Sequence, residues 1–156
     1  MKSLLFAGIF STIATVSSPA HNTKKNMGYD NYKLKGTWKI TSIDYDKTYK
    51  IKPFDEGADI ECFVGSQWTL IPNNNTGSYS ISGENCPNIT TPFRFNVTAD
   101  GKFAFKKVSK GIKAKTVTAG YFLQLQNQAQ NSFDMLQIVG DSSSPVNVVY
   151  HFQKIN

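Results

Sequence analysis

The sequence has few of the residues from which most enzyme sites and nucleic-acid interfaces are built. Its 156 residues include two His, two Cys and one Arg, Arg94. It contains no nucleophile elbow, H-E-x-x-H motif or glycine-rich phosphate loop. We therefore predict a protein that is not an enzyme, with no catalytic residues, no metal site and no cofactor. No nucleic-acid partner is expected either, because such interfaces combine aromatic rings with arginine.

Long hydrophobic runs are also scarce. One apolar run, 4–10, follows Lys2, and Ser18-Pro19-Ala20 supplies the small residues of a cleavage site. This pattern predicts a secretory signal peptide at 1–20, and hence a periplasmic or secreted protein. No Cys follows the run, so a bacterial lipid anchor is not predicted at this position. No later stretch approaches membrane length, and we expect no transmembrane segment.

Residues 21–33 are polar and lack periodicity, so we interpret them as a flexible leader before the domain. The two cysteines of the domain are Cys62 and Cys86. An even count in an exported chain favours one structural disulfide between them. A redox pair would be closer in sequence, and a zinc site would need more ligands.

Aromatic residues are plentiful, with eleven Phe and seven Tyr, and many alternate with polar residues as in β-strands. The stretch 47–57 is looser, with room for one helical turn, 73–77 is a turn, and 83–92 is a loop. Asp100-Gly101 is a strong hairpin signal. Strands are expected at 37–46, 66–71, 79–81, 93–97, 103–105, 117–126, 133–139 and 146–154.

Eight strands with short connections predict an all-β domain with an antiparallel up-and-down order. Closure into an eight-stranded barrel would remove exposed strand edges and leave an interior sized for side chains or one small ligand. A two-sheet β-sandwich is the alternative architecture.

Gly36-Thr37-Trp38 opens the first expected strand and resembles the G-x-W motif of lipocalins. The resemblance implies that Gly36 lets the chain turn beneath the barrel and that Trp38 closes that end. It also implies that Lys154, near the end of the last strand, packs over the indole. Residues 58–68, with 73–75 and 77–79, are similar to the second and third strands of lipocalin-like domains from small exported Bacteroidetes proteins. The domain is therefore expected to span 34–156.

We predict a lipocalin-like binding protein whose barrel holds a small hydrophobic or amphipathic ligand, and we expect it to be a monomer. In the alternative, aromatic side chains fill the barrel, and an envelope interaction protein or inhibitor acts through the loops at 47–65 and 83–92. The residues expected to line the ligand site are Trp68, Leu70, Phe93, Phe95, Phe103, Phe105, Tyr121, Leu123, Leu125 and Tyr150.

Three polar features remain. His151 alternates with Tyr150 and Phe152, so we expect it to point out of the barrel, solvated or hydrogen-bonded. A carboxylate group lacks EF-hand spacing and is interpreted as a solvated rim loop, with a calcium site or an acid–base pair as alternatives. These carboxylates are Asp55, Glu56, Asp59 and Glu61. A lysine cluster is interpreted as a solvated strand face and hairpin tip. It comprises Lys102, Lys106, Lys107, Lys110, Lys113 and Lys115.

Overall fold

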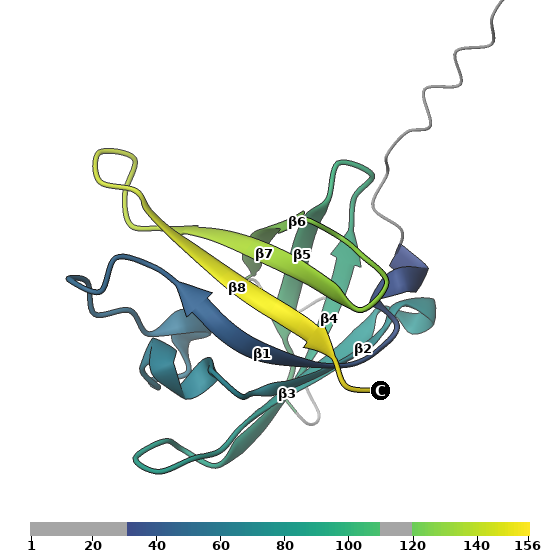
Figure 1. The fold of residues 1–156 in the computed structure, drawn as a ribbon, viewed down its shortest axis with the longest axis horizontal. Helices are drawn as coiled ribbons and strands as arrows, with labels where there is room; N and C mark the ends of the chain where they lie inside the picture. Colours follow the sequence, from purple (N-terminus) through teal and green to yellow (C-terminus); the bar gives the residue numbers. More distant parts are fainter. Residues whose placement is uncertain (1–30, 110–119) are drawn as a thin grey trace, which may run out of the picture.

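The computed structural model describes residues 31–109 and 120–156 (Figure 1). The predicted signal peptide and most of the predicted leader lie outside these ranges. So do the first residues of the strand expected from 117, together with Lys110, Lys113 and Lys115. The last leader residues belong to a short 3-10 helix, η1 (Asn31–Leu34). Within the described ranges, no helix has the length and apolar character needed to span a membrane.

The described chain forms a closed antiparallel barrel in which each strand pairs with its sequence neighbours and β8 pairs with β1 (Figure 1). The predicted up-and-down barrel is therefore confirmed, and the sandwich alternative is wrong. The strands are β1 (Gly36–Asp44), β2 (Gln67–Ile71), β3 (Thr76–Ile81), β4 (Ile89–Val97), β5 (Lys102–Lys107), β6 (Tyr121–Gln126), β7 (Ser132–Val139) and β8 (Val146–Lys154).

Strand direction gives the barrel two different ends. One end carries η1, the C-terminus and η4 (Pro72–Asn74), at the right of Figure 1. The other end carries the β1–β2, β3–β4 and β7–β8 connections, at the left of Figure 1. The β1–β2 connection contains two more 3-10 helices, η2 (Pro53–Asp55) and η3 (Ile60–Phe63). We refer to the first end as the floor and to the second as the mouth.

Trp38 closes the floor. Its side chain is fully buried, and its indole Nε1 donates a hydrogen bond to the Leu34 carbonyl at 2.7 Å. The ring of Phe133 meets it edge-on, with centroids 4.6 Å apart. Lys154 Nζ lies 5.4 Å from the Trp38 ring centroid, within the range of a cation–π contact. This arrangement matches the one that the G-x-W resemblance implies.

Gly36 permits the close approach of the C-terminal residues to the start of β1. Its φ is +134°, and a Cβ at this position would lie 2.5 Å from the Asn156 carbonyl oxygen. The adjacent Thr37 N–H donates to that same oxygen at 2.9 Å. A side chain at position 36 would therefore strain the backbone and also disturb the contact that holds the floor together.

We expect Gly36→Ala to lower the free energy of unfolding by at least about 1 kcal/mol more than Gly57→Ala. Both glycines have a positive φ, but a Cβ at Gly57 would meet no atom within 4 Å. Gly57→Ala thus carries the strain of a positive φ alone, whereas Gly36→Ala adds a less accessible φ of +134° and the clash at the floor. Urea unfolding of the two variants measures the difference, and equal losses would contradict this account of the floor.

Two segments differ from the sequence-based expectation. β4 begins at Ile89, inside the expected loop 83–92, because Ile89 pairs with Ile81 and Thr91 with Tyr79. Residues 60–63, expected to resemble part of a strand, form η3 instead, with Ile60 and Phe63 buried against the core. The turn of helix expected within 47–57 is η2.

Candidate functional site

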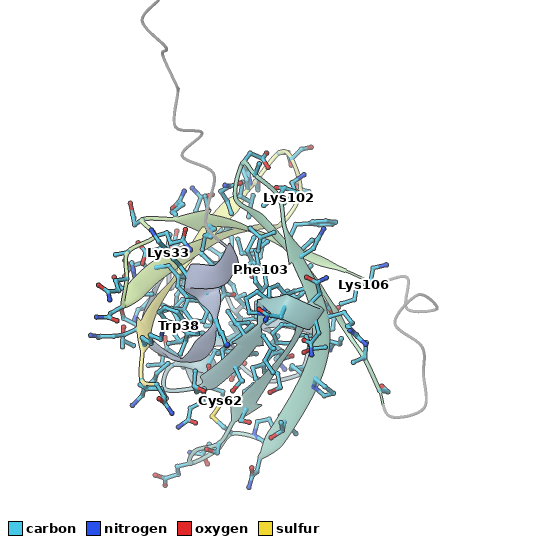
Figure 2. The ribbon with its side chains drawn as sticks, turned by 90° about the vertical axis from the view of Figure 1, so that its right-hand side faces the viewer. Lys33, Trp38, Cys62, Lys102, Phe103 and Lys106 are labelled. Carbon is cyan, nitrogen blue, oxygen red and sulfur yellow. A yellow bond between two sulfur atoms is a disulfide. The ribbon has the colours of Figure 1, made fainter. Side chains whose placement is uncertain are left out.

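Two connections at the mouth are joined covalently. Cys62 in η3 forms a disulfide with Cys86 in the β3–β4 connection, with an S–S distance of 2.03 Å. The bond appears in yellow beside Cys62 in Figure 2. It fixes η3 at the rim of the barrel, so the residues that precede η3 are held at their C-terminal side. The two ends of this preceding segment are joined by a hydrogen bond from the Ile60 N–H to the Ile51 carbonyl at 3.0 Å. We call residues 51–60 the lid loop.

Replacement of both cysteines by alanine should lower the free energy of unfolding by roughly 3 kcal/mol, because the closed loop restricts the unfolded chain. The half-cystines are 24 residues apart in sequence. Urea denaturation of the double variant measures the loss, and reduction of the wild-type protein should reproduce it. Unchanged stability in both experiments would show that the bond contributes nothing to the fold.

The lid loop inserts the side chain of Phe54 into the barrel. This side chain is only 3% exposed although it belongs to a loop. It meets six aromatic rings at centroid distances of 5.1 to 6.3 Å. We call these six rings the aromatic cage. They belong to Phe63, Trp68, Tyr79, Phe105, Tyr121 and Tyr150.

The backbone that carries Phe54 is strained. Phe54 has φ = +57° and Asp55 has φ = +52°, so two consecutive non-glycine residues adopt the left-handed region. Each such residue costs about 1–3 kcal/mol. Burial of one Phe side chain contributes about 1.5–3 kcal/mol, and ring contacts add to it. The buried side chains of Ala58 and Ile60 in the same loop add to this packing, and polar contacts also hold the lid loop in place.

Glu56 makes most of these polar contacts. Its Oε1 atom accepts hydrogen bonds from the Tyr79 hydroxyl and, at 2.9 Å, from the Thr91 hydroxyl. The same oxygen lies 3.5 Å from Lys107 Nζ, which also donates to the Phe54 carbonyl at 2.6 Å. One carboxylate therefore joins the lid loop to β3, β4 and β5.

These contacts correct two predictions about charged residues. The Glu56 side chain is only 11% exposed, so it is not part of a solvated loop. Lys107 likewise points toward the lid loop rather than lying on a solvated strand face. Asp55 accepts from the Tyr121 hydroxyl at 2.7 Å, and Glu61 accepts from the Tyr45 hydroxyl at 2.7 Å. The carboxylates thus have separate partners, and the described residues contain no cluster of three or more potential metal ligands.

The tyrosine hydroxyls at the mouth remain protonated. Burial, followed by the hydrogen bond to Glu56, raises the pKa of Tyr79 well above its ordinary value. Burial and the hydrogen bond to Asp55 do the same for the pKa of Tyr121. Burial also raises the pKa of Tyr150, whose hydroxyl donates to Gln137 Oε1 at 2.7 Å. These groups therefore act as hydrogen-bond donors over the whole physiological pH range.

A pocket of about 410 Å³ lies beside the lid loop at the mouth. Residues 49–55 form one wall, and the ends of β6, β7 and β8 form the other through Tyr121, Gln137 and Val146. Phe54 lines this pocket and lies inside the aromatic cage. Tyr121 lines the pocket and is one of the cage rings. These two side chains therefore separate the pocket from the packed interior of the barrel.

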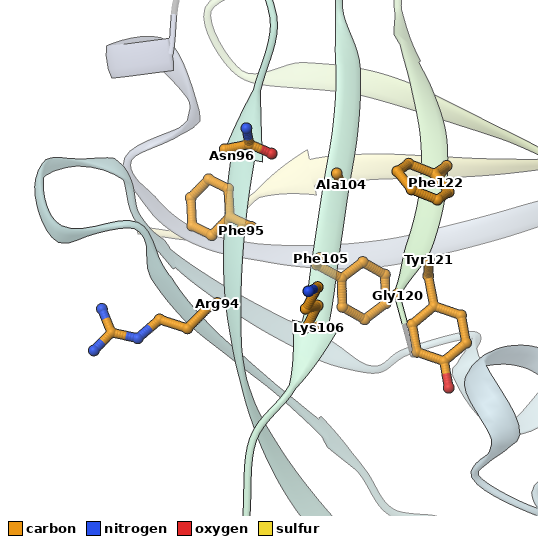
Figure 3. A pocket seen from close by; sticks show the side chains of 9 residues that line it. All are labelled: Arg94, Phe95, Asn96, Ala104, Phe105, Lys106, Gly120, Tyr121 and Phe122. Atoms are coloured by element: carbon orange, nitrogen blue, oxygen red, sulfur yellow. The ribbon is translucent and has the colours of Figure 1, made fainter. Parts of the chain in front are cut away.

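A second pocket, of about 240 Å³, lies on the outer wall of β4, β5 and β6. Figure 3 shows Ala104 between Asn96 and Phe122, its register partners on the two neighbouring strands. Phe122 is 63% exposed. Lys102 and Lys106 come from the same outward-facing positions of β5 (Figure 2). This pocket is separate from the aromatic cage, although Phe105 and Tyr121 contribute to both.

Nine of the ten residues expected to line a ligand site are buried in the barrel, and Tyr121 is half-buried at the mouth. They divide into two levels. Four belong to the aromatic cage, and the other six are core residues outside it: Leu70, Phe93, Phe95, Phe103, Leu123 and Leu125. Sequence reasoning missed Phe54, Phe63, Tyr79 and Thr91 at the mouth. It named Glu56 and Lys107 but interpreted them as solvated. A single Phe in a loop between Pro53 and two carboxylates carries no periodic signal.

His151 lies on the outer wall of the barrel and is hydrogen-bonded. Its Nδ1 atom is 2.7 Å from Asp134 Oδ1, and its Nε2 atom is 2.8 Å from Asp44 Oδ2. Partial burial acts to lower the pKa of His151, but the hydrogen bonds and charges of Asp44 and Asp134 outweigh it, and the pKa is raised. The imidazole of His151 therefore links β1, β8 and β7.

Because the folded pKa of His151 is raised, its contribution to stability is full below the unfolded value of about 6.5. The contribution is lost as the pH rises through the folded pKa. We expect the free energy of unfolding to fall from about pH 6 upward through neutrality. Urea titrations across this range measure the fall, and His151→Asn should abolish it. An equally steep fall in that variant would show that another group is responsible.

The fold and the mouth together define a small closed barrel with a sealed floor and one covered opening. The family model for the lipocalin-like domain matches residues 34–122, more than half of the chain. The chain therefore belongs to the lipocalin-like domain family, as the G-x-W resemblance predicts. The sequence matches no curated protein.

Solved structures with a similar fold include a lipocalin-like protein from Bacteroides uniformis. Its sequence is 9% identical, the match covers 79% of this chain and 99% of that one, and the TM-score is 0.49. Bovine odorant-binding protein in complex with a selenium-containing odorant is 13% identical, with coverage of 81% and 76% and a TM-score of 0.45.

Proposed function

We propose that this lipocalin-like protein is an exported, non-catalytic binding protein for a small hydrophobic or amphipathic ligand. The ligand binds in the aromatic cage after the lid loop has moved out of the mouth. One observation carries the proposal: the cage already surrounds an apolar group of small-ligand size, the Phe54 ring, which a loop with a strained backbone supplies. A site of this kind is lined by apolar and aromatic side chains with a few polar groups that fix orientation.

The packing of the barrel supports binding at the mouth rather than near the floor. Toward the floor, Phe95 stacks on Phe103 with centroids 5.0 Å apart, and Phe133 stacks on Phe152 at 4.6 Å. These residues lie on strands and are held by the sheet. Phe54, in contrast, belongs to a connection that is not part of the hydrogen-bonded ladder of the barrel strands. Its removal would vacate a volume lined by the six cage rings without disturbing the hydrogen bonds between strands.

We expect a neutral fluorescent probe, N-phenyl-1-naphthylamine, to bind saturably and to bind Phe54→Ala about tenfold more tightly. The variant removes the ring that competes for the cage and leaves a cavity lined by apolar groups, which binds apolar molecules. Fluorescence titration at neutral pH measures both affinities.

Phe122→Ala is the matched control because it removes an equal ring from the outer wall. Its affinity for the probe should equal that of the wild type. Loss of binding in Phe122→Ala alone would place the probe in the outer pocket and contradict the proposal. The absence of saturable binding to wild type and Phe54→Ala would instead favour a packed barrel that acts through its rim loops.

A further inference from the structure

The mouth of the barrel carries hydrogen-bond donors that face the lid loop. They come from adjacent strands at inward-facing positions: Tyr79 pairs in register with Thr91, and Lys107 pairs with Phe93, the next inward residue of β4. Tyr121 extends the row on β6. All four face acceptors that belong to the lid loop, namely the Glu56 and Asp55 carboxylates and the Phe54 carbonyl.

This row of donors lies beside the aromatic cage. Tyr79 and Tyr121 belong to both, since their rings contact Phe54 while their hydroxyls bind carboxylates of the lid loop. An open mouth would expose an apolar chamber with an ammonium group and three hydroxyls at its edge. Partly buried donors without acceptors are unfavourable. A ligand that only fills the cage would leave these donors without hydrogen-bond acceptors.

The lid loop shows which groups fill the aromatic cage and also supply acceptors to the row of donors. Phe54 provides an apolar ring, and Glu56, two residues later, provides a carboxylate that accepts hydrogen bonds from Tyr79 and Thr91 next to Lys107. The segment therefore has the chemistry of an amphipathic acid that occupies the site from within the chain. A free ligand that replaces it needs the same two parts, an apolar body and an anionic head.

We propose that the site binds small hydrophobic monocarboxylates, such as alkyl or aryl acids, and that Phe54 and Glu56 are their internal substitutes. The apolar body takes the place of the Phe54 ring in the aromatic cage. The carboxylate takes the place of the Glu56 carboxylate against Lys107, Thr91 and Tyr79. This assignment rests on the proposed function and adds to it the chemical class of the ligand.

Competition against bound N-phenyl-1-naphthylamine at pH 7 tests the assignment with two probes of equal chain length, dodecanoate and dodecan-1-ol. Both should displace the dye, and dodecanoate should bind about tenfold more tightly, since hydrogen bonds to charged groups are the stronger ones. Lys107→Met should remove this preference by weakening dodecanoate binding alone. Dodecan-1-ol binding in the same variant reports whether the chamber is intact.

The matched control is Lys106→Met, because Lys106 precedes Lys107 on β5 and faces the outer wall. It should keep the full preference for dodecanoate. Lys107 also binds the Phe54 carbonyl, so Thr91→Val provides a second test if Lys107→Met does not fold. That variant removes one hydroxyl donor at nearly constant shape, and it should weaken dodecanoate binding several-fold and leave dodecan-1-ol binding unchanged.

The possible results distinguish the ligand class from the proposed binding function. A preference for dodecanoate that is lost in Lys107→Met, or reduced in Thr91→Val, supports the assignment. Equal affinities of wild type for the two probes, or a preference lost in Lys106→Met, would overturn the assignment and leave the proposed function standing. Failure of both probes to displace the dye from wild type and from Phe54→Ala would overturn the proposed function itself.

Discussion

The packing of the Phe54 ring closes the mouth of the barrel, and the arrangement of the other residues at the mouth depends on it. Six aromatic rings enclose it, so it completes the core of the mouth in the way that Trp38 completes the core of the floor. The two differ in attachment. Trp38 lies in β1 and is held by the sheet, whereas Phe54 lies on a loop with two left-handed residues. One end of the barrel is thus closed by a residue of a strand and the other by a residue of a loop.

Charge reinforces this asymmetry. The carboxylates of the lid loop bind donors on β3 to β6, and the best-buried of them, Glu56, faces the Lys107 ammonium. A charge pair of this kind stabilises the closed loop only while both partners remain in place, because either one alone would be desolvated without compensation. An anionic ligand head exchanges one carboxylate for another and avoids that cost, whereas a neutral ligand does not.

The sequence predicted the barrel because its strands alternate strictly and its floor carries the G-x-W motif. It did not predict the start of β4, because Pro92 suggested a loop although it lies within a strand, opposite Ser78. It predicted the cage rings of Trp68, Phe105, Tyr121 and Tyr150 and missed that of Tyr79. It did not predict the roles of Phe54 and Glu56. Those two residues acquire their roles from a 3-10 turn, a positive φ and a disulfide nearby, none of which has a periodic signature.

A structure of the protein in complex with dodecanoate tests the central claim most directly. The account predicts that the alkyl chain lies among the rings of Trp68, Tyr79 and Phe105, with the carboxylate beside Lys107 and the Phe54 ring displaced from the barrel. A complex in which Phe54 keeps its place and the ligand lies on the outer wall, beside Phe122, would contradict it.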